Sequence, residues 1–520
     1  MTSSGIQYPV ISSLGKPSSV YTGKAIVAAA LCSVDVDAGE DVIADSTWRE
    51  GGYTRHFVKS LQLSAKGKYE TLKIANAGLD YCYSNFEFNG VKLKDVVVDM
   101  KSRPSFHTAV VKGNQKRASF DVPVGGENIS QAQLLRTLKN WKKKGVAEPE
   151  AVDAVERFLN NQEDYCKYLK ANHLFVVMGA GAAMGPFEIL LKLGLSVVAI
   201  DLDRPAIWER LIKAAENSPG TLYYPVRTMQ DGQTVPGCNL MTDIVDVSKW
   251  LGTLLPQYNM TLGNYAYVDG QNFVKIVLAM DFISKTVYEH RAKDSKCSLA
   301  YLCSPTDAFF WPTPAIKQSK QMYANRSYSD AAASMVSIQR FCQSNEGSQA
   351  PPAFGHRIIE CFVTQQGPNY ALAKRIQHWR ALVARNLFGV SVSTNVAPSS
   401  STASVTSNTL LAAAYEGTKN FPPLEIFEPG TSNSLMTAML IEDICNTESV
   451  AHSNVPLEHP LYLFSSGAWH GGFWRCPYKL SSIVEYAALF GLSKRYEGFL
   501  WIALGIGLIS AKRVYHRSRL

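Results

Sequence analysis

The stretch from His173 to Asp203, HLFVVMGAGAAMGPFEILLKLGLSVVAIDLD, decides the fold. LFVVM is an apolar run that ends in glycines, AAMGPFEILLKLG has helical spacing and ends at Gly194, and LSVVAID is a second apolar run. A strand, a helix and a strand in that order are typical of a parallel sheet covered by helices. We therefore predict that such a sheet starts at about residue 171.

Alternation of strand and helix patterns continues after this unit. Residues 258–270 (YNMTLGNYAYVDG) are typical of a strand that enters a turn, residues 272–292 of a long helix, and SLAYLCS at 298–304 of another strand. Parallel strands joined in this way form sheets with helices on both faces. The predicted fold class is therefore α/β, with a Rossmann-type doubly wound parallel sheet over about residues 171–440.

Two further segments are predicted outside the core of the sheet, one before it and one inserted within it. Short apolar runs broken by Gly, Asn and Asp over residues 24–120 predict a strand-rich start, and helical spacing over 129–170 predicts a helical hairpin. Residues 1–170 are thus predicted to be an additional N-terminal α+β region of unknown function. A proline-ended segment at about 305–357 is predicted to be an insertion, either a lid or a dimer arm.

The C-terminal residues 441–520 combine an aromatic loop with an apolar helical tail. Residues 466–478 (SGAWHGGFWRCPY) suit either a glycine-hinged loop over an apolar substrate or a set of core aromatics. Residues 498–511 carry no charge but are shorter than the roughly 20 residues that span a bilayer, which favours a buried or interfacial helix over a membrane-associated tail. Ser518-Arg519-Leu520 resembles a peroxisomal import tripeptide; the alternatives are the cytoplasm or a membrane surface.

Composition limits the class of protein. With 520 residues, 46% hydrophobic and 18% charged, the chain is expected to be globular with a sizeable core. Its net charge of +8 is spread out, which disfavours nucleic acid as a partner. The ten cysteines form no Cys-x-x-Cys pair and the ten histidines no metal-binding spacing, so we expect a reducing compartment and no metal site.

Three glycines follow the first strand of the predicted sheet. Gly179, Gly181 and Gly185 allow a tight turn whose N–H groups approach a pyrophosphate at a helix start. Asp201 ends the second strand, where a carboxylate can accept the hydroxyls of an adenosine ribose. Because this carboxylate repels a 2′-phosphate, NAD is favoured over NADP, although Arg204 reduces the preference. A close helix–strand crossing beside a solvated acid, or the S-adenosylmethionine site of a methyltransferase, would have the same pattern.

Tyr370 and Lys374 are four residues apart in a helical pattern and so share one helix face. An ammonium beside a phenol lowers the pKa of the phenol from ~10, which makes Tyr370 a usable proton donor or acceptor. The alternative is a half-buried tyrosine beside a solvated lysine. Residues 389–404 (GVSVSTNVAPSSSTAS) then predict a strand that ends in Asn-Val-Ala-Pro before a Ser/Thr loop.

The order of these motifs resembles that of the short-chain dehydrogenase/reductase family over about residues 171–410. The resemblance implies a Rossmann NAD(P)-binding domain in which Tyr370 is the catalytic acid/base. It also implies that Lys374 binds the nicotinamide ribose and tunes Tyr370, and that Thr402 lies near the carboxamide.

Other positions follow from the same resemblance. The family's active-site serine corresponds to Ser304, preferred over Thr364 because Ser304 stands at a strand end. Tyr267 to Gly270 replace the family's Asn-Asn-Ala-Gly, which leaves Asp269 at the adenine-side turn. Asp243 is the carboxylate nearest to the position that contacts adenine.

The predicted function is NAD(P)-dependent reduction of a carbonyl or oxidation of an alcohol on an apolar or lipid-like small molecule, by a homo-oligomer. The alternatives are a catalytically degenerate Rossmann nucleotide-binding or scaffold protein and an S-adenosylmethionine-dependent methyltransferase.

Overall fold

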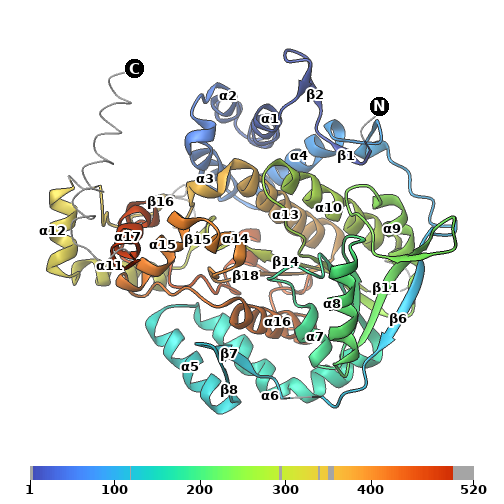
Figure 1. Cartoon of the computed structure of the whole chain (residues 1–520). Helices are drawn as coiled ribbons and strands as arrows, with labels where there is room; N and C mark the ends of the chain where they lie inside the picture. Colours follow the sequence, from blue (N-terminus) through green and yellow to red (C-terminus); the bar gives the residue numbers. More distant parts are fainter. Residues whose placement is uncertain (1–3, 118, 292–295, 338–339, 350–356, 496–520) are drawn as a thin grey trace.

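The computed structural model describes residues 4–117, 119–291, 296–337, 340–349 and 357–495. At its centre lies a mostly parallel sheet with helices on both faces (Figure 1). The parallel strands lie in the order β11 (Thr221–Thr228), β10 (Ser196–Ile200), β9 (His173–Met178), β13 (Asn259–Asn264), β14 (Cys297–Cys303) and β18 (Ser391–Val396). Numbered along the chain, this is the order 3-2-1-4-5-6 of doubly wound sheets. The predicted α/β class is confirmed at this level, and the sheet is compatible with a Rossmann-like fold.

The first strand, β9, is buried on both of its faces. Leu174, Val176 and Met178 belong to one hydrophobic core, and Phe175 and Val177 belong to the other. Side chains of successive strand residues point to opposite sides of a sheet. The uninterrupted apolar run of β9 thus supplies both cores, as expected for a parallel strand between two helical layers.

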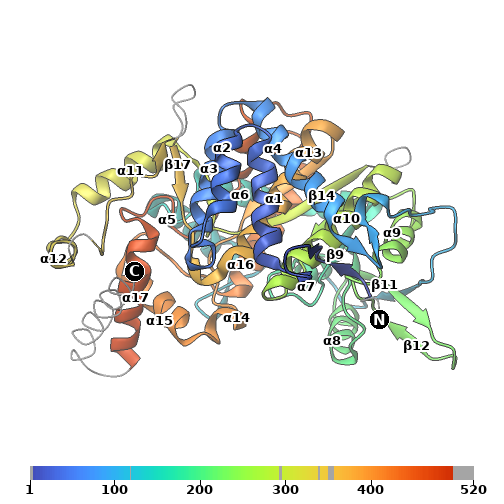
Figure 2. The same cartoon turned by 90° about the horizontal axis from the view of Figure 1, so that it is seen from above.

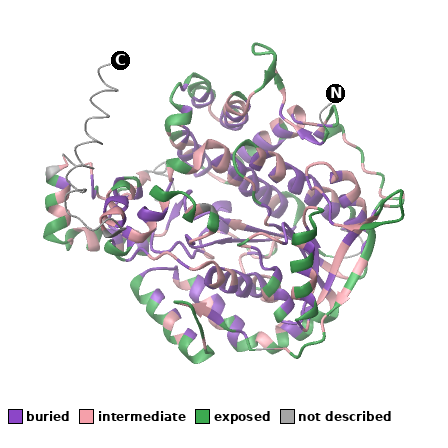
Figure 3. Ribbon diagram, in the orientation of Figure 1, coloured by how far each residue is buried: buried purple, intermediate pink, exposed green. Residues whose placement is uncertain are grey.

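Helices from different parts of the chain form these two layers (Figure 1). The first layer contains α9 (Ile244–Thr253), α10 (Gln271–Arg291) and α13 (Gly367–Phe388). The second contains α6 (Pro149–Asn172), α7 (Phe187–Lys192), α8 (Pro205–Glu216) and α16 (Pro429–Cys445). The strands of the sheet and the helix faces that meet it are largely buried (Figure 3).

The N-terminal region is mainly helical up to residue 85, so the predicted strand-rich start is wrong there. It forms α1 (Ser19–Cys32), α2 (Val36–Ala44), α3 (Tyr53–Ser64) and α4 (Lys68–Asn85). In α1 the buried Ile26, Val27, Ala30 and Leu31 recur at helical spacing, and the Ser18 side chain accepts a hydrogen bond at the helix start. Alanines favour the helix, and packing of α1 and α4 against α13 outweighs the β-propensity of its valine and isoleucine.

The N-terminal region also contributes to the sheet and to the second layer. β6 (His107–Lys112) pairs antiparallel with β11, beside the short β12 (Thr234–Pro236) on the same edge. The segment for which a helical hairpin is predicted forms α5 (Gln131–Lys144) and α6, and Gly145 between them has a φ of 80°.

The segment between β14 and α13 places two helices, α11 (Thr313–Ala324) and α12 (Tyr328–Val336), at the periphery (Figure 2), whereas its first strand, β15 (Ala308–Trp311), is buried. It also contains β16 (Ser348–Gln349) and β17 (Arg357–Glu360). The strands β15, β17 and β16 pair as a small antiparallel sheet.

The aromatic residues at 466–478 lie mostly in the interior. Trp469, His470 and Trp474 are fully buried, so these side chains fill the core, whereas Phe473 also lines the cavity described below. The chain continues into α17 (Leu480–Arg495), which packs against α15 (Thr409–Gly417). The apolar run 498–511 and the terminal tripeptide lie outside the described residues. Within the described part of the chain, no helix has the length and hydropathy needed to cross a membrane.

Candidate functional site

A cavity of about 660 Å³ opens at the carboxyl ends of four parallel strands. The loops that follow β9, β13, β14 and β18 supply Ala182–Met184, Tyr265–Gly270, Ser304–Thr306 and Ala397–Ser400 to its wall. Ligands of doubly wound sheets bind at this edge, where the loops diverge. The cavity is therefore the candidate site.

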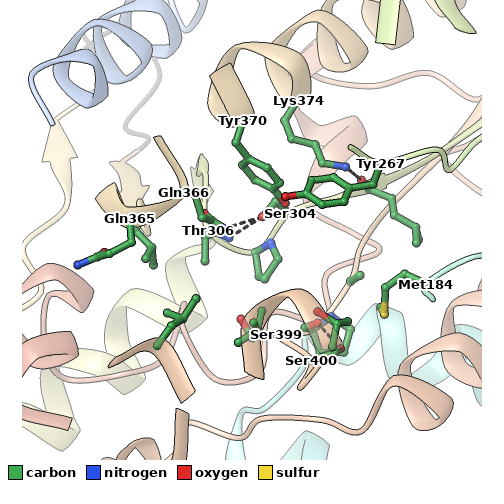
Figure 4. A pocket seen from close by; sticks show the side chains of 18 of the residues that line it. Met184, Tyr267, Ser304, Thr306, Gln365, Gln366, Tyr370, Lys374, Ser399 and Ser400 are labelled. Carbon is green, nitrogen blue, oxygen red and sulfur yellow. Dashed lines mark hydrogen bonds between the residues drawn. The ribbon is translucent and has the colours of Figure 1, made fainter. Parts of the chain in front are cut away.

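Five of the residues predicted from the sequence line this cavity: Ser304, Tyr370, Lys374, Asp269 and Thr402. Ser304 follows β14 and Tyr370 stands in the first turn of α13. The described residues from 307 to 362 between them do not line the cavity, and the chain returns to its wall at Val363. Figure 4 shows the ring of Tyr370 directed toward Ser304, with Lys374 on the same helix. Thr364, the other hydroxyl considered, does not line the cavity.

A chain of side-chain hydrogen bonds holds Ser304. Its Oγ lies 2.7 Å from Thr306 Oγ1, and the Thr306 hydroxyl donates to Gln366 Oε1 over 2.6 Å. Because the Thr306 proton is used in this way, the Ser304–Thr306 bond requires Ser304 to donate. Ser304 Oγ also accepts from the Thr306 backbone N–H over 3.3 Å. Sequence reasoning missed Thr306 and Gln366, although Thr306 stands only two residues after a predicted site residue.

Tyr370 is a neutral phenol at physiological pH. Burial raises its pKa to about 12, and a hydrogen bond with Ser304 lowers the pKa by less than burial raises it. The expectation that Lys374 would lower the pKa of Tyr370 is wrong for this arrangement, because the cost of burying a phenolate is the larger effect. Tyr370 therefore keeps its proton at neutral pH.

Lys374 has an amine that is bound within the protein. Its Nζ donates to the Leu302 carbonyl oxygen over 2.9 Å and lies 3.4 Å from Gln377 Oε1. Burial lowers the pKa of Lys374 to about 8, against smaller opposing effects of Cys303 and Asp307. The lysine can thus exchange a proton near neutral pH.

The three predicted glycines border the cavity without lining it. Gly179 has a φ of 89°, and a Cβ there would lie 2.5 Å from the Cα of Ala266. At Gly181 a Cβ would lie 2.9 Å from an Arg210 nitrogen, whereas at Gly185 the nearest atom would be 3.4 Å away. The helix predicted to start at this turn begins only at Phe187. The close approach of the Ala266 backbone explains why residue 179 is a glycine. Residues Ala182–Met184, which follow the turn, line the cavity.

Asp201 and Asp243 also lie outside the cavity lining. The two Asp201 oxygens accept from Gly181 N–H over 2.7 Å and from Leu202 N–H over 2.8 Å, so Asp201 holds the glycine turn. Asp243 accepts from Arg227 over 3.3 Å and from the Asn239 N–H over 2.9 Å. Both carboxylates thus have structural partners, although each oxygen keeps a further lone pair.

The turn after the fourth parallel strand starts earlier than predicted. β13 ends at Asn264, so Tyr265 and Ala266 follow it directly, rather than Tyr267 to Gly270. Asn264 lines the cavity and donates to Ser284 Oγ over 3.3 Å. Asp269 accepts from the Tyr267 hydroxyl over 2.6 Å. Asn264 is a buried polar side chain of this site that sequence reasoning missed.

Comparison of the chain with protein-family models, with curated proteins and with solved structures finds no significant match in any of the three.

Proposed function

We propose that this chain is an NAD(P)-dependent oxidoreductase of short-chain dehydrogenase/reductase type, which reduces a carbonyl or oxidises an alcohol. The observation that carries the proposal is the meeting of Ser304, Tyr370 and Lys374 in one cavity at the carboxyl ends of the parallel strands. The loop Ala182–Met184, which follows the glycine turn, lines the same cavity. The motif order along the chain supports the same family.

The residues present fit the nicotinamide half of a dinucleotide. Asn264, Thr402 and Lys374 line the cavity together with residues of the loop after β9. A bound nicotinamide would supply or accept the hydride. Asp201 keeps lone pairs for ribose hydroxyls, which supports a preference for NAD over NADP.

Tyr370 would transfer the proton in this reaction. As a buried phenol with a pKa of about 12, it can donate to the oxygen of a carbonyl substrate in the direction of reduction. The Ser304 hydroxyl, which otherwise donates to Thr306, can turn to the phenolate that remains. Lys374, with a pKa of about 8, can return a proton from solution to the site.

The first test is titration of the protein with NADH, NADPH and S-adenosylmethionine. Binding is measured by nicotinamide fluorescence and by the thermal stabilisation of the protein. We expect NADH to bind more tightly than NADPH, and NADH oxidation with a panel of neutral carbonyl compounds should then identify a substrate.

Tyr370→Phe should lower turnover by about 10²–10⁴-fold and leave NADH affinity within about twofold. Tyr415→Phe removes another phenol from the cavity wall and should keep turnover within a few-fold. Full activity of Tyr370→Phe would overturn the proposal.

A catalytically degenerate nucleotide-binding protein is the second candidate. The observation that favours it is the use of both Asp201 oxygens and of the Lys374 amine in bonds within the chain. It predicts that NADH binds and that no carbonyl compound accelerates its oxidation. Binding of S-adenosylmethionine in place of NADH would support the methyltransferase alternative.

Localisation and assembly are proposed from the sequence alone. We propose peroxisomal import through Ser518-Arg519-Leu520, and transfer of these residues to a fluorescent carrier should direct it to punctate organelles. A diffuse signal would remove this proposal.

The homo-oligomer stays a prediction, and sedimentation velocity of the purified protein tests it.

A further inference from the structure

The cavity extends from Tyr370 into an apolar chamber. The walls of this chamber come from α15 and α17, and its side chains include Leu411, Ala414, Ile483, Val484 and Ala487. Phe473, from the aromatic loop, lines the same cavity. Ser304 and Tyr370 line the cavity at the carboxyl edge of the sheet and lie close together (Figure 4), and Tyr415 of α15 lines the same cavity. The cavity thus combines hydroxyl groups at the carboxyl edge of the sheet with apolar side chains from α15 and α17.

Two features of α15 and α17 form the chamber. The helices lie side by side (Figures 1 and 2) and touch through glycines: a Cβ on Gly417 or Gly491 would meet the backbone of the opposite helix. Because the two helices touch in this way, they form a continuous wall on one side of the chamber. Small residues, Ala414 and Ala487, face the inside and leave the volume that larger side chains would fill.

The apolar chamber offers no charged group to an ionised substrate. Among the described residues that line the cavity, Asp269 and Lys374 alone carry a charged group. Asp269 binds the Tyr267 hydroxyl, and Lys374 binds the Leu302 carbonyl. A carboxylate or phosphate placed in the apolar chamber would therefore lose its hydration without gaining a cation.

We propose that the chamber binds the hydrocarbon chain of a neutral long-chain carbonyl or alcohol, with its oxygen at Ser304 and Tyr370. This inference rests on the proposed function only for the orientation of the polar end. Burial of each methylene group contributes to binding, so affinity should rise about fourfold per methylene until the chamber is full.

The test is calorimetric titration of the cofactor-free protein with 1-butanol, 1-hexanol, 1-octanol and octanoate. We expect a steep rise in affinity with chain length and at least tenfold weaker binding of octanoate than of 1-octanol. Tyr370→Phe should weaken 1-octanol binding by about fivefold, through loss of one hydrogen bond. Equal affinity for all three alcohols, or octanoate binding as tightly as 1-octanol, would overturn the proposal.

Adjacent residues of α15 provide a matched pair of variants. Leu411 lines the cavity, whereas Leu410 is 53% exposed and does not. Leu411→Trp should weaken 1-octanol binding at least tenfold, and Leu410→Trp should leave it within twofold. If Leu411→Trp does not fold, Val484→Trp with exposed Ser481→Trp as its control makes the same comparison on α17. Equal effects of both members of a pair would contradict the chamber.

The outcomes for the chamber and for the proposed function are distinguishable. If longer alcohols bind more tightly but NADH does not bind, the oxidoreductase proposal is contradicted and the chamber proposal stands. Binding of NADH together with chain-independent binding of alcohols would overturn the chamber alone.

Discussion

Lys374 Nζ donates a 2.9 Å hydrogen bond to the main-chain carbonyl oxygen of Leu302, seventy-two residues earlier in the chain. The bond ties α13 to the end of β14, so the helix that carries Tyr370 is held against the strand that positions Ser304. The ammonium is buried as a result, which lowers the pKa of Lys374 to about 8.

This pKa predicts a pH-dependent stability that Lys374→Met should remove. The folded-state pKa of about 8 lies below the ordinary 10.5, so burial of the charge destabilises the fold fully below pH 8. Between pH 8 and 10.5 the unfolded chain binds more protons, and stability rises with pH. We expect the free energy of unfolding of the wild type, minus that of the variant, to increase by about 2 kcal/mol from pH 7 to pH 10. Urea unfolding at both pH values measures it, and a constant difference would contradict the burial of a charged Lys374.

The hydrogen bonds of Thr306 should contribute measurably to stability. Thr306→Val leaves the buried Ser304 hydroxyl and Gln366 Oε1 without this partner and should cost about 1–3 kcal/mol. Thr306→Ser keeps the hydroxyl and should cost less than half as much. Denaturant unfolding compares the two variants, and equal losses would mean that the methyl group, not the hydroxyl, matters at this position.

Glu148 should stabilise the fold only above acidic pH. Burial alone would raise its pKa, but hydrogen bonds from His470 and Arg475 outweigh burial and lower the pKa from 4.5 to about 2. This stabilisation is complete above pH 4.5 and is lost as the pH falls toward 2. Glu148→Gln should therefore cost about 3 kcal/mol at pH 7 and about 1 kcal/mol at pH 3. Equal losses at the two pH values would show that the carboxylate charge is not the cause.

A buried ion pair joins α10 to α13, and a tyrosine of the N-terminal region binds it. Arg380 binds both oxygens of Asp281 over 2.7 and 2.8 Å, and the Tyr83 hydroxyl of α4 donates to the same carboxylate. Asp281→Ala leaves Arg380 buried without its counter-charge and should cost about 3–5 kcal/mol. Tyr83→Phe removes one hydrogen bond and should cost about 1 kcal/mol. Thermal and urea unfolding test this order, and a larger loss for Tyr83→Phe would contradict it.

The glycines of the turn after β9 should differ in their tolerance of alanine. Gly179→Ala requires a φ of 89° and brings a Cβ to 2.5 Å from Ala266, so we expect a loss of about 2 kcal/mol or more. Gly185→Ala has neither obstacle and should stay within about 1 kcal/mol of the wild type. Urea unfolding of both variants measures these losses of stability. A larger loss for Gly185→Ala than for Gly179→Ala would contradict the described conformation of the turn.

The central sheet was predictable because its signals are local. The apolar run of β9 needs no polar face, and Gly179 stands where only a glycine accommodates the backbone. Tyr370 and Lys374 could be paired from their four-residue spacing alone. By contrast, the continuous apolar run from Ile26 to Leu31 suits either a strand or a helix, and its packing against α4 and α13 decided the helix.

The sequence by itself determined the parallel α/β core and which side chains were candidates for the site. Only the tertiary structure decided which candidates meet. Ser304 joins Tyr370 because the chain leaves the cavity wall after Thr306 and returns to it at Val363, whereas Asp243 is held elsewhere by Arg227. Burial decided the pKa of Tyr370, against the expectation from Lys374. The physical reason is that spacing along a helix or strand is written in the chain, whereas desolvation and long-range hydrogen bonds depend on residues that are distant in sequence and meet only in the folded protein.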